Sequence, residues 1–160
     1  MEERVLGIRC VDMNKQKNSK NQVWRVILAT CAGLVLGMAV NSVLISQSHL
    51  IIPPPEGTDL TNVEGITKAL PLLQPLHFLV PFFAHALGTF TAVFIAGSIV
   101  PFLKWKFAII FGVINLVGGI GAAVMIPAPK WFIVTDLALA YLPFAFLGAW
   151  LAVRMNKSPN

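Results

Sequence analysis

Residues 76–99 read LHFLVPFFAHALGTFTAVFIAGSI, and this stretch decides the fold class. As a helix it is long enough to cross about 30 Å of hydrocarbon at about 1.5 Å per residue. Its small residues recur at intervals of four and therefore fall near one helix face; they are Ala84, Gly88, Ala92 and Ala96. An apolar helix with such a face is typical of a membrane span that packs closely against a neighbour.

Three further stretches qualify as spans by the same criterion, namely residues 24–46, 106–126 and 131–153. The chain of 160 residues is 56% hydrophobic and only 12% charged, and its mean hydropathy is +0.75. That composition leaves too little polar surface for a soluble domain. We therefore predict an all-α polytopic membrane protein, a bundle of four antiparallel transmembrane helices, with no large aqueous domain and no nucleic-acid partner.

Two tails flank the predicted transmembrane domain of residues 23–153. Residues 1–22 have no periodic pattern and are predicted to be a disordered cytoplasmic tail, within which Met13 is an alternative start. Residues 154–160 form a second cytoplasmic tail. The first apolar run has no small-x-small cleavage site, so we interpret the first span as an uncleaved signal anchor.

Lysine and arginine are divided unevenly between the two sides of this topology. Of the 12, ten lie on the side of the two tails and the 100–106 turn, and two, Lys68 and Lys130, lie on the other side. The positive-inside rule therefore places both termini in the cytoplasm of a bacterial inner membrane, with residues 47–75 and 127–130 facing outward. The tryptophans also fall at span ends, where the headgroup level favours them: Trp24, Trp105, Trp131 and Trp150.

The outer segment, residues 47–75, is the only place for structure outside the bilayer. Thr61 and Glu64 have the spacing of a capping box, which predicts a short helix over about 62–70 that ends before Pro71. Its apolar residues recur at helical spacing. We expect this helix to lie over the mouth of the bundle or on the membrane surface, as a packing lid in preference to a binding element.

Small residues within the spans are the candidate helix-packing positions. They let helix backbones approach closely, which matters in lipid because van der Waals packing replaces a hydrophobic drive between helices. A compact bundle explains them, and the alternative is the seam of a homo-oligomer. The positions are Gly33, Gly37, Ala84, Gly88, Ala92, Gly118 and Gly119.

Polar residues within the spans form a candidate site near the outer ends of the helices. Counting helical rises predicts that they share one polar layer: Asn41, His85, Thr89, Asn115 and Asp136. An ionisable group in a span is costly unless it is paired or hydrated, so His85 and Asp136 are each other's expected partners. The alternative is that Asp136 reaches water beside Lys130 and that His85 bonds to a helix carbonyl.

No motif in the sequence points to a known catalytic or metal centre. There is no GxSG, HExxH or CxxC pattern, and Cys10 and Cys31 are too far apart to form a redox pair or a zinc knuckle. We therefore predict no cofactor, no metal and no catalytic residue. The first span also lacks the carboxylate that small multidrug exporters place there.

Three short motifs resemble a family of uncharacterised bacterial four-helix membrane proteins. They are PPPEGTD at 53–59, AHALGT at 84–89 and IPAPKWF at 126–132, in the order and spacing of that family. The resemblance extends over roughly residues 24–153. It implies the fold and the membrane location but no activity, because none is assigned to the family.

Three classes of function remain after these exclusions. The leading expectation is a non-catalytic membrane protein that acts through contacts with membrane lipids, a membrane protein partner or copies of itself. A small transporter or proton-coupled carrier that uses His85 and Asp136 is the first alternative, although the inner half of every span is almost wholly apolar. A lipid-modifying enzyme is the second alternative.

Overall fold

The computed structural model describes the backbone of residues 2–156 and the side chains of residues 20–155, and this part of the chain is helical with no strands. The helices are α1 (Glu2–Ser46), α2 (Ser48–Ile51), α3 (Val63–Ala69), α4 (Leu79–Ile99), α5 (Lys104–Met125), α6 (Lys130–Leu139) and α7 (Leu142–Asn156). Single turns of 3₁₀ helix join them at η1 (Leu70–Leu72), η2 (Pro75–Phe78) and η3 (Pro101–Leu103).

Four helical segments are long and apolar enough to cross a membrane, and their bounds lie close to those predicted. They are Lys20–Ser46, Pro75–Ile99, Pro101–Met125 and Lys130–Met155. The structure therefore confirms the all-α multi-pass bundle with a short helix outside the spans.

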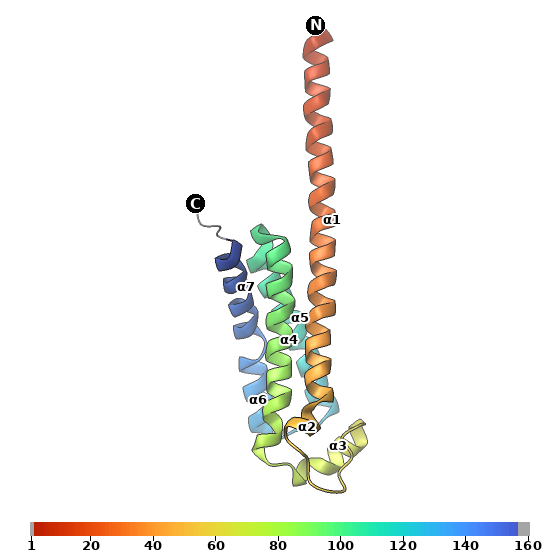
Figure 1. The fold of residues 1–160 in the computed structure, drawn as a ribbon, viewed down its shortest axis with the longest axis vertical. Coiled ribbons are helices and arrows are strands. Elements are labelled where there is room, and N and C mark those ends of the chain that lie inside the picture. The colour runs from red at the N-terminus through yellow and green to blue at the C-terminus, as the bar shows by residue number, and fades with distance from the viewer. Residues whose placement is uncertain (1, 157–160) are drawn as a thin grey trace.

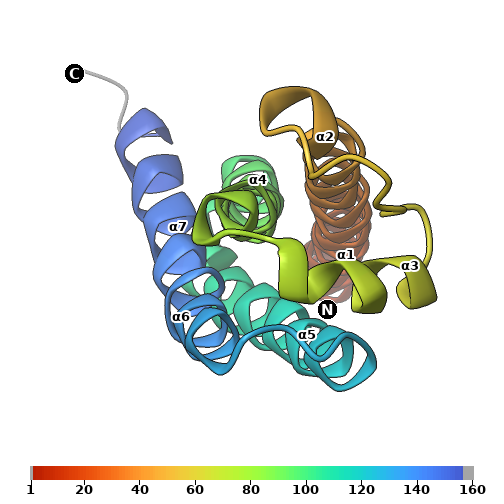
Figure 2. The ribbon, with the colours of Figure 1, turned by 90° about the horizontal axis from the view of Figure 1, so that it is seen from below.

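The bundle is built around α4, which packs against α1, α5 and α7. The N-terminus, η3 and the end of α7 lie at one end of the bundle, and α2 and α3 lie at the other (Figure 1). We call the first the terminal end and the second, which residues 47–78 cover, the roofed end. Viewed onto the roofed end, α3 and the turns after it cross between α1 and α5 (Figure 2).

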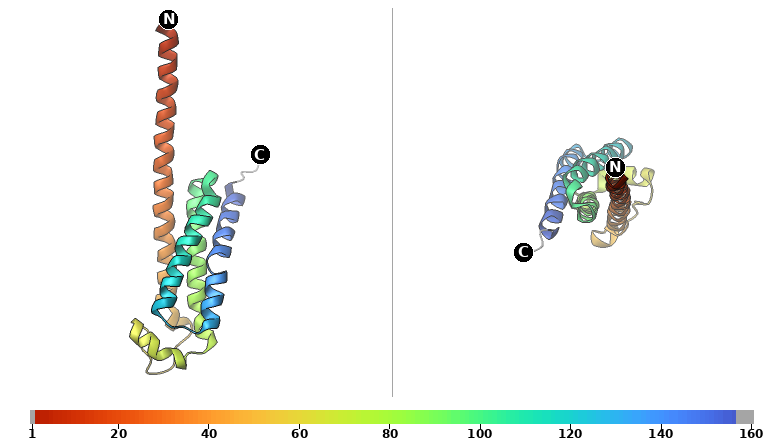
Figure 3. Two further views of the ribbon diagram at one scale, coloured as in Figure 1. Left: turned by 180° about the vertical axis from the view of Figure 1, so that it is seen from behind. Right: turned by 90° about the horizontal axis from the view of Figure 1, so that it is seen from above.

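The first helix differs from the prediction at its N-terminus. We expected residues 1–22 to be disordered, but α1 is helical from Glu2 and extends well beyond the other helices at the terminal end (Figure 3). Residues 2–22 contain neither proline nor a turn signal. A helix already nucleated by the membrane span can therefore continue through them without a new nucleation step.

Glycine brings α1 and α4 into backbone contact. A Cβ added at Gly37 would lie 2.7 Å from the carbonyl oxygen of Gly88 and 2.8 Å from the Cβ of Ala92. Gly33 faces the carbonyl of Ala92 in the same way. These four predicted packing positions therefore form one seam, and Ala84 is also fully buried.

The predicted packing role, in which helix backbones approach closely, is wrong for Gly118 and Gly119 of α5. Gly118 is exposed, and a Cβ added there would meet nothing within 4 Å. Gly119 does face a neighbour, but that neighbour is the ring and hydroxyl of Tyr141, not a helix backbone. Gly119 therefore accommodates a side chain, Gly118 leaves an open face, and neither of them makes a helix-helix seam.

Proline interrupts one span and not the other. Pro143 lies in the first turn of α7, directly after the gap between α6 and α7, where it has no N–H to donate to the carbonyl of Leu139 and its ring crowds that carbonyl. The fourth span is therefore two helices. Pro81 lies in the first turn of α4, where proline needs no partner and causes no kink.

Residues 47–78 form the roof of the bundle. Within it, the N-terminal cap of α3 differs from the predicted capping box. The side chain of Asn62 accepts a hydrogen bond from the backbone N–H of Gly65 (2.8 Å), so Asn62 and not Thr61 caps α3. Thr61 instead donates its N–H and hydroxyl to Asp59, and these bonds lower the pKa of the Asp59 carboxyl. The helix ends at Ala69, and the chain passes Pro71 as a 3₁₀ turn.

We predict that alanine at Gly37 will destabilise the protein while alanine at Gly118 will not. The added methyl group at Gly37 meets backbone, and overpacking of this kind costs about 1–3 kcal/mol. At Gly118 the methyl group enters open space, so Gly118→Ala should be neutral or stabilising by up to about 1 kcal/mol. Thermal unfolding of both variants in the same detergent tests this, and equal effects would show that the α1–α4 seam is not a close contact.

A candidate ligand site at the roofed end

The centre of the site is a hydrogen-bonded pair of ionisable side chains from two spans. His85 on α4 lies with its Nδ1 2.9 Å from Oδ1 and 3.0 Å from Oδ2 of Asp136 on α6. Asp136 is 4% exposed, and His85 is partly buried. The expected contact is therefore present. The alternative, in which Asp136 is hydrated beside Lys130, does not apply, because Asp136 is buried.

Tyr141 completes a triad that the sequence analysis did not identify. Its hydroxyl donates to Oδ2 of Asp136 (2.9 Å) and lies 3.2 Å from Nδ1 of His85. Tyr141 occupies the gap between α6 and α7, and it is the single tyrosine of the chain. The available signal was its position two residues before Pro143, because a proline-broken span turns a residue away from the regular helical face.

The hydrogen bonds of the triad fit a carboxylate that accepts from two donors. An ionised carboxylate only accepts, so in that arrangement His85 Nδ1 and the Tyr141 hydroxyl both donate to Asp136. The proton of a neutral His85 is then held on Nδ1, and Nε2 carries a free lone pair. Thr89 donates its hydroxyl to the backbone carbonyl of His85 (2.9 Å), within α4.

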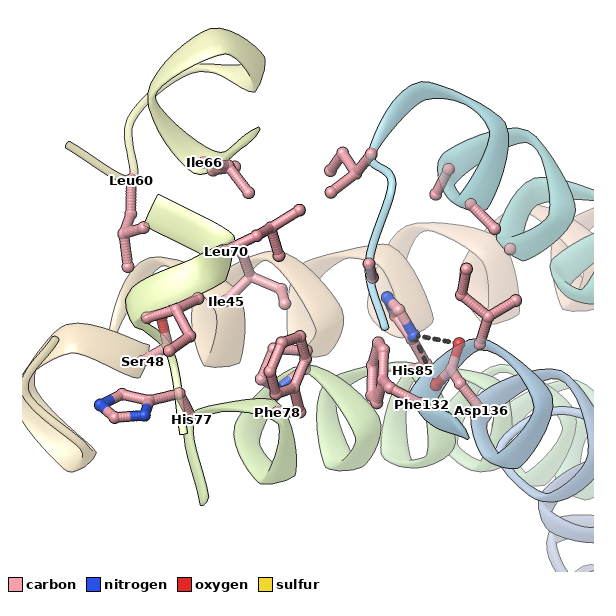
Figure 4. Close-up of a pocket in the computed structure, with 18 of the residues that line it drawn as sticks. Ile45, Ser48, Leu60, Ile66, Leu70, His77, Phe78, His85, Phe132 and Asp136 are labelled. Carbon is pink, nitrogen blue, oxygen red and sulfur yellow. Dashed lines mark hydrogen bonds and ion pairs between the residues drawn. The ribbon is translucent and has the colours of Figure 1, made fainter. Parts of the chain in front are cut away.

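A cavity of about 240 Å³ lies between this triad and the roof. Figure 4 shows His85 and Asp136 on one side of it and residues of α1, α3 and the adjoining turns on the other. The second ring nitrogen of His85, Nε2, points toward the cavity (Figure 4). Most of the lining is apolar: Ile45, Ile52, Leu60, Ile66, Leu70, Leu73, Phe78, Pro81, Gly119, Ala122, Ala123, Ile126, Ala128, Phe132, Ile133 and Leu137, with Ser48, His77, His85 and Asp136 as the polar members.

The predicted polar layer does not form as a single cluster. Asn41 lies on the α1–α4 seam, where its Cβ packs against Gly88. Asn115 donates its side-chain N–H to the carbonyl of Phe111 (2.8 Å) one turn earlier on its own helix. Neither asparagine lines the cavity, because helical rotation directs both side chains elsewhere although their depth is similar.

The described residues offer no ready metal centre. Within residues 20–155 no group of three or more His, Cys, Asp or Glu side chains is placed to hold a metal ion. His77 is the other histidine at the cavity. Its Nε2 lies 3.1 Å from the carbonyl oxygen of Pro53, so it links two parts of the roof. The chemistry available at the cavity is therefore hydrogen bonding through His85 and Ser48 and apolar contact.

No protein-family model, curated protein or solved structure matches the chain.

We predict that His85 and Asp136 contribute to stability as a coupled pair. Asp136→Asn and His85→Gln should each destabilise the protein, and the double variant should lose less than their sum, with a coupling energy of about 0.5–3 kcal/mol. Removal of His85 leaves the buried carboxylate with Tyr141 alone, so His85→Gln should be the more harmful single change. Thermal unfolding of the wild type and the three variants measures the coupling. Strictly additive losses would contradict a direct contact.

Proposed function

We propose that this chain is a non-catalytic membrane protein that binds one small apolar molecule in the cavity at its roofed end. The observation that carries the proposal is the combination of a mostly apolar lining with a few polar groups, of which His85 Nε2 is directed into the cavity from its base. Ligand pockets are typically apolar with a few placed polar groups that fix orientation. The bound molecule would come from the membrane or its surface, because the cavity lies within and directly above the outer ends of the spans.

The packing of the terminal half of the bundle favours binding over transport. Four large side chains there are buried in one cluster: Val93, Val100, Phe107 and Phe111. The guanidinium of Arg25 donates to the carbonyl oxygen of Ile99 (2.9 Å) at the terminal end. A carrier needs a path that opens on both sides, and this half of the bundle is filled with close-packed apolar side chains. The carrier alternative therefore has weaker support.

The enzyme alternative also has weaker support. A histidine oriented by a carboxylate is the geometry of a general base, which needs a nucleophile within hydrogen-bond reach. Among the cavity-lining residues the only hydroxyl belongs to Ser48, and Figure 4 places Ser48 on the far side from His85. The triad as built is better suited to hold a ligand than to activate a side chain.

The roofed end is proposed to face outward from a bacterial inner membrane, with both termini in the cytoplasm. Nine of the 11 lysines and arginines within residues 2–156 are at the terminal end, and the positive-inside rule retains that end in the cytoplasm. The tryptophans support a position in which the two ends of the bundle lie at the two headgroup levels. Trp131 lies at the roofed end and the three others lie at the terminal end, and all four are more than 40% exposed. We also propose that the chain belongs to the uncharacterised four-helix family and that it assembles with copies of itself or with another membrane protein.

We predict that a bulky residue in the cavity will abolish binding of an apolar probe. A diazirine-bearing dodecane can be photocrosslinked to the full-length protein in phosphatidylcholine nanodiscs, and the labelled residues can be mapped by mass spectrometry. Ala123→Phe fills part of the cavity and should reduce labelling there about tenfold or more, because a loss of about 1.4 kcal/mol has that effect.

The matched control is Val124→Phe on the same helix. Val124 is 81% exposed and does not line the cavity, so this variant should label like the wild type. Labelling spread evenly over lipid-facing residues, with no difference between the two variants, would contradict a binding cavity.

We predict that cysteine at Glu56 will react with an impermeant maleimide added to intact cells, whereas cysteine at Phe102 will not. Both positions are exposed, and they lie in the roof and in η3 at opposite ends of the bundle. Cys10 and Cys31 are first replaced by serine to remove the native thiols. Reaction at Phe102→Cys in intact cells, with none at Glu56→Cys, would reverse the proposed orientation.

A further inference from the structure

We infer that the cavity selects an uncharged amphiphile whose single polar end is a hydroxyl, and that this hydroxyl donates to His85 Nε2 while the apolar body points toward the roof. The inference rests on the proposed function and assigns the chemical class of the bound molecule. Three features of the site lead to it: the hydrogen-bonding role of Nε2, the charge at the base of the cavity and the depth of the polar group.

The hydrogen-bonding role of Nε2 is that of an acceptor. Asp136 holds the proton of neutral His85 on Nδ1, so the lone pair on Nε2 faces the cavity. No residue among 20–155 is in hydrogen-bond contact with this nitrogen, since every hydrogen-bond contact of the His85 ring is made through Nδ1. A ligand that brings a hydrogen-bond donor satisfies it, and a ligand with only ether or ester oxygens does not.

The charge at the base of the cavity excludes an anion. No lysine or arginine lines the cavity, and the nearest formal charge is the carboxylate of Asp136 itself. A carboxylate or phosphate would therefore meet a like charge without any compensating cation. A cation is disfavoured for a different reason, because both oxygens of Asp136 already accept from His85 and Tyr141 and burial of an ammonium in apolar walls is costly.

The depth of the polar group gives the orientation of the molecule and excludes ordinary phospholipids. His85 and Asp136 each lie six residues into their helices, which is about 9 Å below the outer helix ends. The roof above them is mostly apolar, with Leu60, Ile66 and Leu70 facing the cavity and Ser48 and His77 as its polar members (Figure 4). The hydrogen-bonding group at the base of the cavity thus lies deeper than these apolar roof residues, whereas headgroups are outermost in a bilayer. A phospholipid that filled this cavity would bury its headgroup or place its chains against His85.

The size of the cavity limits the molecule to a single chain or a small ring system. Drug-sized ligands occupy pockets of about 300–1,000 Å³, and this cavity of about 240 Å³ lies below that range. A molecule with two acyl chains does not fit within it. A long-chain alcohol and an alkylphenol are the two sources of a terminal hydroxyl that have a suitable shape.

The test compares photoprobes that differ only at the polar end. Diazirine-bearing dodecanol, its methyl ether, dodecanoate, dodecylamine and an alkylphenol of matched length are each crosslinked to the full-length protein in phosphatidylcholine nanodiscs. We expect dodecanol or the alkylphenol to label cavity residues about tenfold more than the methyl ether, since a tenfold preference corresponds to about 1.4 kcal/mol, the scale of one buried hydrogen bond. The stronger of the two identifies the aliphatic or the aromatic hydroxyl as the source.

The variants locate the preference at His85. Val124→Phe lies outside the cavity and should retain the preference for the hydroxyl, whereas His85→Phe should lose it and label equally with alcohol and ether. If His85→Phe does not fold, the comparison of probes on the wild type still decides the matter.

The outcomes separate this inference from the proposed function. Equal labelling of the cavity by alcohol and ether, or stronger labelling by dodecanoate or dodecylamine, would overturn the hydroxyl assignment and leave the binding cavity standing. Labelling of cavity residues by none of the probes would overturn the proposed function itself. Competition by the nanodisc phospholipid, seen as weaker labelling when its mole fraction rises at constant probe density in the bilayer, would contradict the inverted orientation.

Discussion

The site depends on the need to stabilise one carboxylate inside a membrane helix. An ionised Asp136 with 4% of its surface exposed cannot rely on water, so the protein must supply its hydrogen bonds. The donors come from two other helical segments, because His85 belongs to α4 and Tyr141 to the junction before α7. This one requirement ties together three segments that lie far apart in the sequence and determines which face each of them turns inward.

The packing around the carboxylate is arranged to admit those donors. Tyr141 reaches Asp136 because the fourth span is interrupted before Pro143 and because Gly119 of α5 leaves room for the tyrosine ring. On the other side of the bundle, glycines 33, 37 and 88 let α1 and α4 approach at backbone distance. In lipid, where apolar surface gains little by leaving the solvent, such close approach is a main source of helix association. The small residues thus serve two purposes, one at a backbone seam and one beneath an aromatic ring.

The sequence alone predicts the parts of this structure that follow from local or one-dimensional properties. Apolar length yields the four spans, and the cost of an unpaired charge in lipid correctly joins His85 to Asp136. The prediction of one polar layer fails for Asn41 and Asn115. The depth of a residue along a helix can be counted from the sequence, but the direction of its side chain about the helix axis depends on packing. The sequence alone also misses Tyr141, whose inward position arises from a broken helix, and the cavity, which exists only through the arrangement of four segments.

The division of the pair between helices has a mechanical consequence for the bundle. Helices α1 and α4 are in close backbone contact. The roof, residues 47–78, connects the end of α1 to the start of α4. The opposite wall of the cavity belongs to α5 and α6. His85 on α4 and Asp136 on α6 therefore join these two walls at the base of the cavity, and their hydrogen bond closes it at that end. If the two walls move apart, the distance between His85 Nδ1 and the Asp136 carboxylate increases. That distance is therefore a measure of how far the cavity is open.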